Sequence, residues 1–270
     1  MSASGSGAPS PGTGRRGDGH GLRRAPRFGF DLVAAVVILL GAAFRLRIHT
    51  TGLAHVPRQG GAVLAFTHTS HVDLITTMYH VYRRRGRRCR FLAAKELWSG
   101  RGFRIIAWLV GAIPVERGSA AARQRSRAAA VAAAADGEVV MLAPEGRISA
   151  SFEVAPLHTG AARIAQAAGV PLVPTVSWGA QRISTTGQPF RWRRARGVPV
   201  LVAIGEPLRP APDDDPVAVT TELRRRLATL LDEVQRRYPD GAPAGAWWVP
   251  ARLGGGAPSP PDEDTAYRAR

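Results

Sequence analysis

The sequence predicts an α/β fold built on a mainly parallel mixed sheet that is covered by helices, with an apolar helix at the N-terminal side. Short apolar runs such as 62–66 and 139–143 alternate with longer helix-forming segments. Continuous apolar strands are typical of parallel sheets, because helices cover both faces of such sheets. Active sites in these folds lie at the carboxyl ends of the strands. The chemistry is therefore expected directly after residues 66, 115 and 143.

Composition narrows the class of protein. The chain has 270 residues, of which 45% are hydrophobic, enough for one sizeable core. The single cysteine, Cys89, excludes an internal disulfide framework and a cysteine-based zinc cluster. The formal net charge of +17 favours anionic partners. One of the 37 basic residues is lysine, Lys95, and such an arginine-rich composition is typical of GC-rich genomes, so the charge alone identifies no ligand.

The composition divides the chain into four segments. Residues 1–27 are rich in Ser, Gly, Pro and Arg and are expected to form a disordered basic tail. Residues 28–44 are apolar and are expected to form a membrane-associated helix. Residues 45–238 are expected to form the folded domain. Residues 239–270 are rich in Gly, Pro and acidic residues and are expected to be a second disordered tail.

The apolar segment 28–44 is too short for an ordinary membrane span. Its uncharged part between Asp31 and Arg45 has 13 residues, whereas a helix needs about 20 to cross the hydrocarbon core. A helix that is buried or lies on the membrane surface is the favoured interpretation. A tilted span and a signal peptide cleaved at 41–43 are the alternatives. Arginines on both sides suit an anionic cytoplasmic leaflet, so a peripheral or monotopic position on the cytoplasmic face of the cell membrane is expected.

Two periodicities predict the elements of the domain in order. Apolar and polar residues alternate from Phe44 towards Gly52, which indicates a strand. The run 62–66 indicates a buried strand, and a helix is expected to begin near Ser70. Alanine favours helix over 119–135. The other expected strands are 91–95, 111–115, 139–143, 170–178 and 198–205, and the other expected helices are 103–110, 159–168 and the amphipathic segment 216–237.

The segment that follows the strand 62–66 contains a potential general base. His68 and Asp73 are five residues apart, which on a continuous helix leaves them about 140° from a common face. If Ser70 caps the helix, His68 lies in the preceding loop and can fold back towards Asp73. A carboxylate on one imidazole nitrogen then supports proton uptake at the other. The alternative is that Asp73 only caps the helix and His68 is an ordinary loop histidine.

Two more segments place polar residues at strand ends. After 139–143, Gly146 permits a close backbone approach, Glu145 can orient a donor or a hydroxyl, and Arg147 can pair with phosphate. After 111–115, the chain delivers Arg117 to the same edge. Taken singly, the first segment is better interpreted as an ordinary exposed turn and Arg117 as a solvated arginine.

Together, these segments resemble the glycerolipid acyltransferase family, whose bacterial archetype is the 1-acyl-sn-glycerol-3-phosphate acyltransferase. The resemblance covers roughly residues 44–210, with four motifs in the family's order and spacing. It is carried by His68, Ser70 and Asp73 of a His-x4-Asp motif, by Gly111, Ile113, Pro114 and Arg117, by Pro144, Glu145, Gly146 and Ser149, and by Val170, Pro171, Val173 and Pro174.

The resemblance implies a direct acyl transfer. His68 would take the proton of an acceptor hydroxyl while Asp73 orients the imidazole, and the oxygen would attack the thioester of acyl-CoA or acyl-carrier protein. No metal, no cofactor beyond that co-substrate and no covalent acyl-enzyme are expected. The residues implied in substrate binding are Ser70, Arg117, Glu145, Gly146 and Arg147. The first expected acceptor is 1-acylglycerol 3-phosphate, which would give phosphatidic acid.

The third motif departs from the family pattern. Arg147 stands at the usual Thr position and Ile148 at the usual Arg position, while Thr67 replaces Asn and Ala143 replaces Phe. Another lysolipid or polar lipid is therefore the alternative acceptor.

Two rival functions compete with the enzyme. One is a basic module that binds nucleic acid or an anionic membrane through the six arginines of 83–90. Nothing in the sequence resembles a nucleic-acid-binding fold, so nucleic acid is not an expected partner, whereas anionic membrane lipids are. The other rival is a non-catalytic relative that only binds lipid.

Overall fold

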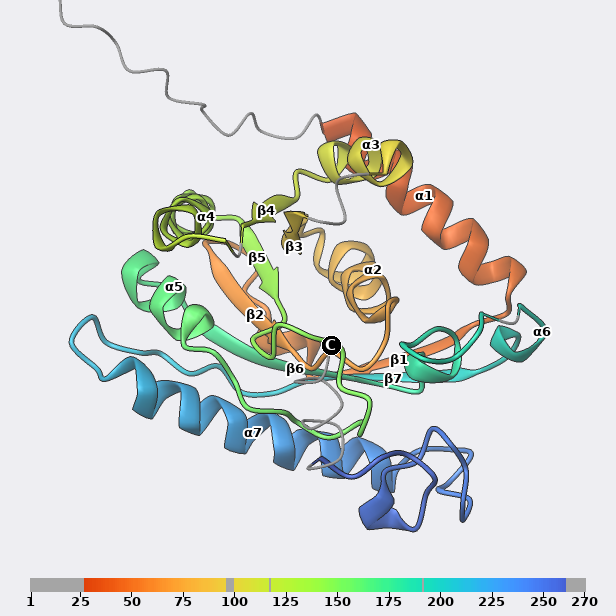
Figure 1. Cartoon of the computed structure of the whole chain (residues 1–270). Coiled ribbons are helices and arrows are strands. Elements are labelled where there is room, and N and C mark those ends of the chain that lie inside the picture. The colour runs from red at the N-terminus through yellow and green to blue at the C-terminus, as the bar shows by residue number, and fades with distance from the viewer. Residues whose placement is uncertain (1–26, 96–99, 117, 191, 261–270) are drawn as a thin grey trace, which may run out of the picture.

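A seven-stranded sheet forms the centre of the protein (Figure 1). The computed structural model of the chain describes residues 27–95, 100–116, 118–190 and 192–260. The strands follow the spatial order β1-β7-β6-β2-β5-β3-β4, and each neighbouring pair is parallel except β6 and β7. Their bounds are β1 Arg47–Thr51, β2 Ala62–Phe66, β3 Cys89–Ala94, β4 Ile113–Val115, β5 Val139–Leu142, β6 Leu172–Trp178 and β7 Pro199–Ile204. The predicted α/β fold with a mixed, mostly parallel sheet is confirmed.

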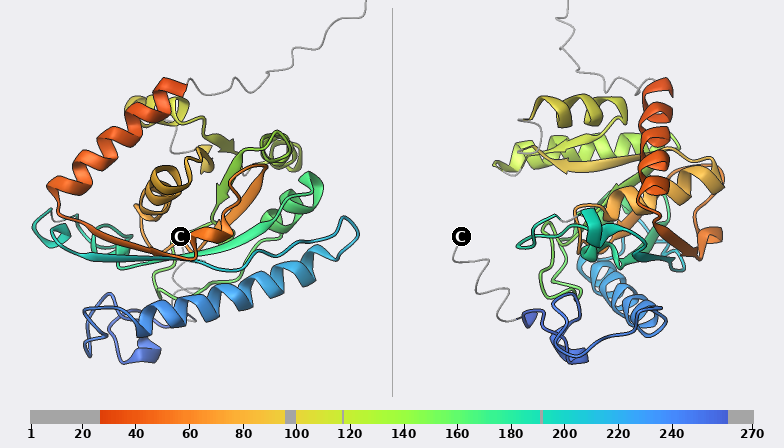
Figure 2. Two further views of the ribbon diagram at one scale, coloured as in Figure 1. Left: turned by 180° about the vertical axis from the view of Figure 1, so that it is seen from behind. Right: turned by 90° about the vertical axis from the view of Figure 1, so that its right-hand side faces the viewer.

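Helices cover both faces of the sheet (Figures 1 and 2). Helix α2 packs on one face, with α1 and α3 beyond it and in contact with each other, while α4, α5 and α7 cover the opposite face. Their bounds are α1 Arg27–Ala43, α2 Asp73–Arg85, α3 Arg101–Leu109, α4 Ala120–Ala135, α5 Gly160–Ala168, α6 Trp192–Ala195 and α7 Pro216–Arg236.

Strand β2 shows why the sheet strands are continuously apolar. Val63 and Ala65 join the core under α4, α5 and α7. Leu64 and Phe66 join the second core under α1, α2 and α3. Because successive side chains point to opposite faces, both faces of this strand are buried. Its carboxyl end is thereby fixed at one edge of the sheet, where the following loop begins.

Strand β1 begins three residues later than the alternation predicted. The amide of Phe44 donates to the carbonyl of Leu40, and the amide of Leu46 donates to that of Gly41. Arg45 between them adopts a left-handed conformation, with φ of 51°. These bonds close the last turn of α1, so residues 44–46 end the helix and the ladder with β7 starts at Arg47.

The segment after α7 corrects one expectation. Residues 239–260 were expected to be disordered, but Trp248 and Val249 are buried and the Trp248 ring lies 5.5 Å from that of Tyr238. Gly255 makes this turn possible, because a Cβ there would lie 2.0 Å from the Val249 carbonyl oxygen. Apolar burial therefore orders this Gly- and Pro-rich stretch. The predicted tails at 1–26 and 261–270 lie outside the described residues.

Helix α1 occupies almost the residues predicted for the apolar helix. Within the described ranges, no helix combines the length and the apolar character that crossing a bilayer requires. Several of its large apolar side chains are exposed: Phe28, Leu32, Val36, Leu39 and Leu40.

Candidate active site

His68 and Asp73 meet at the carboxyl end of β2, as the sequence predicted. The Nδ1 atom of His68 lies 3.6 Å from Oδ2 of Asp73. This is an electrostatic contact, longer than a hydrogen bond, and such contacts often tighten only when the substrate binds. The Asp73 side chain is completely buried, whereas 27% of the His68 side chain is exposed. One imidazole edge therefore faces a buried carboxylate while the ring itself reaches the surface of a cavity.

The geometry that brings the pair together differs from the prediction in one respect. Helix α2 begins at Asp73, and Val72, not Ser70, is its N-cap residue. Oδ2 of Asp73 accepts the backbone N–H groups of Thr69 at 2.7 Å and Ser70 at 2.6 Å. The carboxylate thus turns back over the preceding loop, and this holds His68 beside it.

Ser70 fixes the loop from the other side. Its hydroxyl donates to the carbonyl oxygens of Ala180 at 2.9 Å and Ser184 at 2.6 Å and accepts the N–H of Val72. The residue is fully buried, so its hydroxyl is engaged with the backbone. The predicted contact of Ser70 with substrate stays a prediction. The structure describes a positioning contact.

Burial sets the electrostatics of this loop. Burial raises the pKa of Asp73, against the opposing effects of His68 and the two N–H groups. Burial also lowers the pKa of the neighbouring His71, and the positive charge of protonated His68 acts in the same direction. His71 is therefore neutral at physiological pH, which leaves a neutral ring beside His68.

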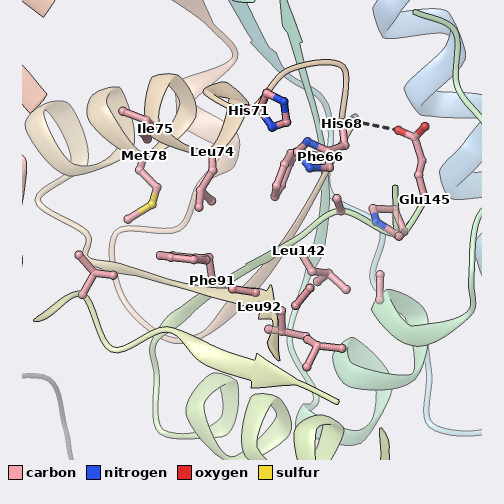
Figure 3. A pocket seen from close by; sticks show the side chains of 18 of the residues that line it. Phe66, His68, His71, Leu74, Ile75, Met78, Phe91, Leu92, Leu142 and Glu145 are labelled. Atoms are coloured by element: carbon pink, nitrogen blue, oxygen red, sulfur yellow. Dashed lines mark hydrogen bonds between the residues drawn. The ribbon is translucent and has the colours of Figure 1, made fainter. Parts of the chain in front are cut away.

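The loop after β5 forms hydrogen bonds with the backbone of His68 (Figure 3). Oε1 of Glu145 accepts the N–H of His68 at 2.9 Å, and Oε2 accepts the N–H of Ala155 at 3.2 Å. The N–H of Ser149 donates to the carbonyl of His68 at 2.7 Å. The third and first predicted motifs are therefore joined at the main chain of His68. Glu145 is 4% exposed, so its described role is to hold the histidine loop.

Two other residues of the third motif line the same cavity. Gly146 has φ of 68°, and a Cβ there would meet the His158 ring at 3.3 Å, so glycine keeps this wall open. Arg147 is partly buried and also lines the cavity. Arg117, predicted from the second motif, lies outside the described residues. Its neighbour Glu116 pairs with Lys95 at 2.9 Å, which lowers the pKa of Glu116.

The cavity beside His68 has a volume of about 2030 Å³ and is mostly apolar. This exceeds the roughly 300–1,000 Å³ usual for a small ligand and suits a long apolar chain. Figure 3 shows Ile75, Met78 and Phe91 on the opposite side of His68 from Glu145. Helices α1 and α3 complete the apolar wall with Phe30, Val33, Val37, Ile106 and Leu109.

Sequence reasoning missed part of this cavity. Arg123 and Arg127 of α4 and Arg163 of α5 line it as well. The available signal was a pair of arginines four residues apart on an otherwise alanine-rich helix, which places both on one face. Nothing in the sequence shows that this face meets the cavity.

Most of the arginines in 83–90 form hydrogen bonds or ion pairs with other parts of the same chain. Arg85 donates to the carbonyl oxygens of Leu53 and Ala54, and Arg87 donates to those of Pro57, Gly60 and Gly137. Arg88 pairs with Asp31, and Arg90 binds Gly111 and Glu138. Four of the six are therefore structural, which removes much of the basis for a binding module built on this segment.

Comparisons with known proteins agree with this geometry. A model of the acyltransferase family matches residues 47–178, which include His68, Asp73 and Arg147. The 1-acyl-sn-glycerol-3-phosphate acyltransferase of Bacillus subtilis (strain 168) is 29% identical over 188 residues, 67% of this chain and 87% of that protein. The crystal structure of the 1-acyl-sn-glycerophosphate (LPA) acyltransferase PlsC from Thermotoga maritima shares the fold, with a TM-score of 0.63 and 18% identity over 77% of this chain and 80% of that one. The chain therefore belongs to the acyltransferase family and is a distant homologue of the 1-acyl-sn-glycerol-3-phosphate acyltransferases.

Proposed function

We propose that this acyltransferase moves a fatty acyl chain from acyl-CoA or acyl-carrier protein to the hydroxyl of 1-acylglycerol 3-phosphate, giving phosphatidic acid. The observation that carries the proposal is the position of His68. Its imidazole is backed by the buried carboxylate of Asp73 and lines a large apolar cavity. The acceptor is also the one named for the relatives in Bacillus subtilis and Thermotoga maritima.

The proposed reaction is one direct displacement. The acceptor hydroxyl gives its proton to Nε2 of His68 as its oxygen attacks the thioester carbonyl carbon, and a tetrahedral intermediate forms. The imidazolium is stabilised by the negative charge of Asp73. The carbon–sulfur bond then breaks, the thiolate takes the proton from His68, and the new ester and the free thiol leave. His68 ends neutral, ready for the next acceptor.

The apolar walls fit the lipid parts of both substrates. Leu74, Met78 and Phe91 extend the cavity away from His68, and α1 and α3 close its far side. Burying an alkyl chain there stabilises the complex by about 0.8 kcal/mol for each CH₂ group. The polar reacting atoms are thereby left at the His68 end.

The acceptor is tested by measuring thiol release from palmitoyl-CoA and palmitoyl-acyl-carrier protein with a panel of lysolipids. We expect 1-acylglycerol 3-phosphate to give the highest kcat/KM, with phosphatidic acid as the product by mass spectrometry. Cys89 does not disturb a thiol reagent, because burial raises its pKa to about 12. A higher kcat/KM for another lysolipid would identify that lipid as the acceptor instead. No thiol release with any donor and acceptor would favour a relative that binds lipid without catalysis.

The same proposal places the protein on the cytoplasmic face of the cell membrane as a peripheral or monotopic protein. Phe28 and Leu39 of α1 are 76% and 69% exposed, and Trp108 of the adjacent α3 is 58% exposed. Large exposed apolar patches mark protein or membrane contacts. The exposed Arg101 and Arg104 of α3 suit anionic lipid head groups.

Vesicle binding tests this placement. We expect the protein to sediment with phosphatidylglycerol-containing vesicles and the double variant Leu39→Asp/Trp108→Asp to lose at least tenfold in binding. Neither side chain lines the cavity. Val217→Asp is the matched control, because Val217 is equally exposed on α7 at the opposite face of the sheet. Equal binding by the double variant and the control would contradict the placement.

A further inference from the structure

We propose that a hollow in the C-terminal half of α2, lined by Tyr79, His80, Arg83 and Arg84, is a second binding site that takes a phosphate group outside the catalytic cavity. The ligand chemistry is a phosphate ester, carried either by a membrane lipid or by a soluble compound. The inference goes beyond the proposed function, because it assigns this hollow no part in acyl transfer.

Arg83 and Arg84 are the two arginines of segment 83–90 that bind neither a backbone carbonyl nor a carboxylate within the described part of the chain. Arg83 donates to the Tyr79 hydroxyl at 2.9 Å, and its guanidinium lies 5.6 Å from the centre of the Tyr79 ring. Arg84 forms neither a hydrogen bond nor an ion pair with any described residue. Both arginines are exposed, so their charges are open to a ligand from solvent.

The spacing of the four residues brings their side chains together. Residues three or four positions apart are neighbours on the surface of a helix. Tyr79 and Arg83 form one such pair on α2, and His80 and Arg84 form another. All four line one hollow of about 450 Å³, and no carboxylate is among its described lining residues. A phosphate would supply the missing counter-charge through charge-assisted hydrogen bonds to the guanidinium groups.

His80 contributes a hydrogen-bonding group that the fold holds in place. The residue is 9% exposed, and its Nδ1 lies 2.7 Å from Oγ1 of Thr50 on β1. Its Nε2 forms no hydrogen bond with any residue that the structure describes. Burial lowers the pKa of His80, and the positive charges of Arg84 and Arg83 act in the same direction. When Thr50 donates to Nδ1, the neutral ring carries its proton on Nε2 and can donate it to a phosphate oxygen.

The hollow is separate from the catalytic pair but adjoins the apolar cavity. His80 follows Asp73 by two helical turns, roughly 10 Å along the axis of α2. Tyr79 lines both the hollow and the cavity. A lipid with its phosphate on Arg83 and Arg84 would therefore have its alkyl chains beside Tyr79, whereas a soluble phosphate would occupy the hollow alone.

Titration with inorganic phosphate tests the site, followed by NMR of the histidine ring signals at constant pH and ionic strength. We expect the His80 signal to shift saturably in the parent protein. Arg84→Gln should weaken the binding about tenfold, the effect of losing one charge-assisted hydrogen bond. Arg236→Gln is the matched control, because Arg236 is also an exposed arginine in the last turn of a helix, α7, and does not line the hollow. It should leave the dissociation constant unchanged.

Two phosphate monoesters then distinguish a lipid from a soluble source. Glycerol 3-phosphate carries the phosphate without alkyl chains, and a monomeric short-chain phosphatidic acid adds the chains. Tighter binding of the phosphatidic acid, again weakened by Arg84→Gln, supports the site and assigns it to a lipid head group. Equal binding of the two ligands, with the same loss in Arg84→Gln, supports the site and assigns it to soluble phosphates.

The inference fails if the His80 signal does not move during the phosphate titration, or if the parent and Arg84→Gln bind phosphate equally. The two arginines would then only offset the negative C-terminal end of the α2 dipole. Arg83→Gln is a second variant that should also weaken binding, and circular dichroism checks that each variant is folded. None of these measurements needs turnover, so failure of the proposed function would leave their outcome unaffected.

Discussion

At the residue scale, the orientation of His68 depends on a carboxylate that the backbone itself holds. Oδ2 of Asp73 accepts two N–H groups from the loop that carries the histidine. The loop is also bound by Ser70 and by Thr185, whose hydroxyl donates to the carbonyl of Thr69 at 2.7 Å. The backbone that carries His68 is therefore held in place before any substrate arrives, which lowers the ordering needed for proton transfer.

The substitution Asp73→Asn removes the negative charge of this side chain and keeps its shape. In Asp73→Asn, the amide oxygen still accepts the N–H groups of Thr69 and Ser70, but the imidazolium loses its counter-charge. We expect kcat to fall by about 10² to 10⁴, the range of a general-base contribution, with a much smaller change in KM. The melting temperature should change little, because burial already raises the pKa of Asp73 and a neutral group suits that site.

The measurement is kcat by acceptor-dependent thiol release, with circular dichroism to follow unfolding. A kcat within threefold of the parent in a folded Asp73→Asn protein would show that the carboxylate only holds the N–H groups of Thr69 and Ser70.

The pairing of His68 with Asp73 was predictable because it depends on local spacing at a loop-to-helix junction. The hydrogen bonds that fix the loop before α2 were not predictable, because the sequence does not show whether Ser70 or Asp73 supplies the oxygen that accepts the loop N–H groups. The arginines of α4 were not predictable as part of the site either. Their side of the helix is readable from the four-residue spacing, but the cavity that it meets is formed by residues far away in the sequence.

At the element scale, α1 is held over the cavity by two polar contacts of Asp31 and one aromatic contact of Phe30. Asp31 accepts the Tyr82 hydroxyl at 2.8 Å and pairs with Arg88 at 2.9 Å. The ring of Phe30 lies 5.1 Å from that of Tyr82. Since α1 supplies one apolar wall of the cavity, this attachment determines whether the acyl-chain site is closed.

The attachment of α1 should depend on pH. The Tyr82 hydroxyl and then Arg88 lower the pKa of Asp31 from its ordinary value of 3.8. Their contribution is therefore complete above that value and is lost as the pH falls through the lower pKa of the folded state. Asp31→Asn should mimic the acid form at neutral pH. Because the pair is exposed, amide hydrogen exchange in α1 should rise by only about twofold to fivefold.

Hydrogen exchange resolved by peptide measures this change directly. Asp240→Asn is the control, since it removes an acid that pairs with Arg182 far from α1. Unchanged exchange in α1 for Asp31→Asn, both at neutral pH and below pH 3, would show that apolar packing alone holds the helix.

The elements themselves were largely predictable, because buried strands and an alanine-rich helix carry strong local signals. The start of β1 was missed because the end of α1 competes for residues 44–46. The order of residues 239–260 was missed because it depends on tertiary packing: Trp248 packs on Tyr238, and Val249 joins the core under α4, α5 and α7. The short helix α6 has no local signal that sets it apart from a turn.

At the scale of the whole molecule, one cavity is lined by apolar side chains of α1, α2 and α3 and by arginines of α4 and α5. Helices α1 and α3 contribute apolar side chains to this cavity and also expose large apolar side chains to the outside. Arg123 and Arg127 of α4 and Arg163 of α5 line the same cavity.

The net charge of +17 did not reveal this division. The sequence shows its densest group of arginines at 83–90 and smaller groups at 123–127, 191–196 and 224–226, so the densest group was the stronger signal. In the folded protein, Arg85 and Arg87 donate to backbone carbonyl groups, while Arg123, Arg127 and Arg163 line one cavity. Charge becomes informative about function only after the fold has assigned each cation its neighbours.

The most direct test of the account is the kcat of His68→Ala relative to the parent, with palmitoyl-CoA and 1-acylglycerol 3-phosphate and with the product identified by mass spectrometry. The matched control is His49→Ala, an exposed histidine on β1. The account predicts a fall of about 10² to 10⁴ in kcat for His68→Ala, with unchanged folding and acceptor binding, and no change for His49→Ala. Formation of phosphatidic acid by folded His68→Ala protein at a rate within threefold of the parent would contradict it.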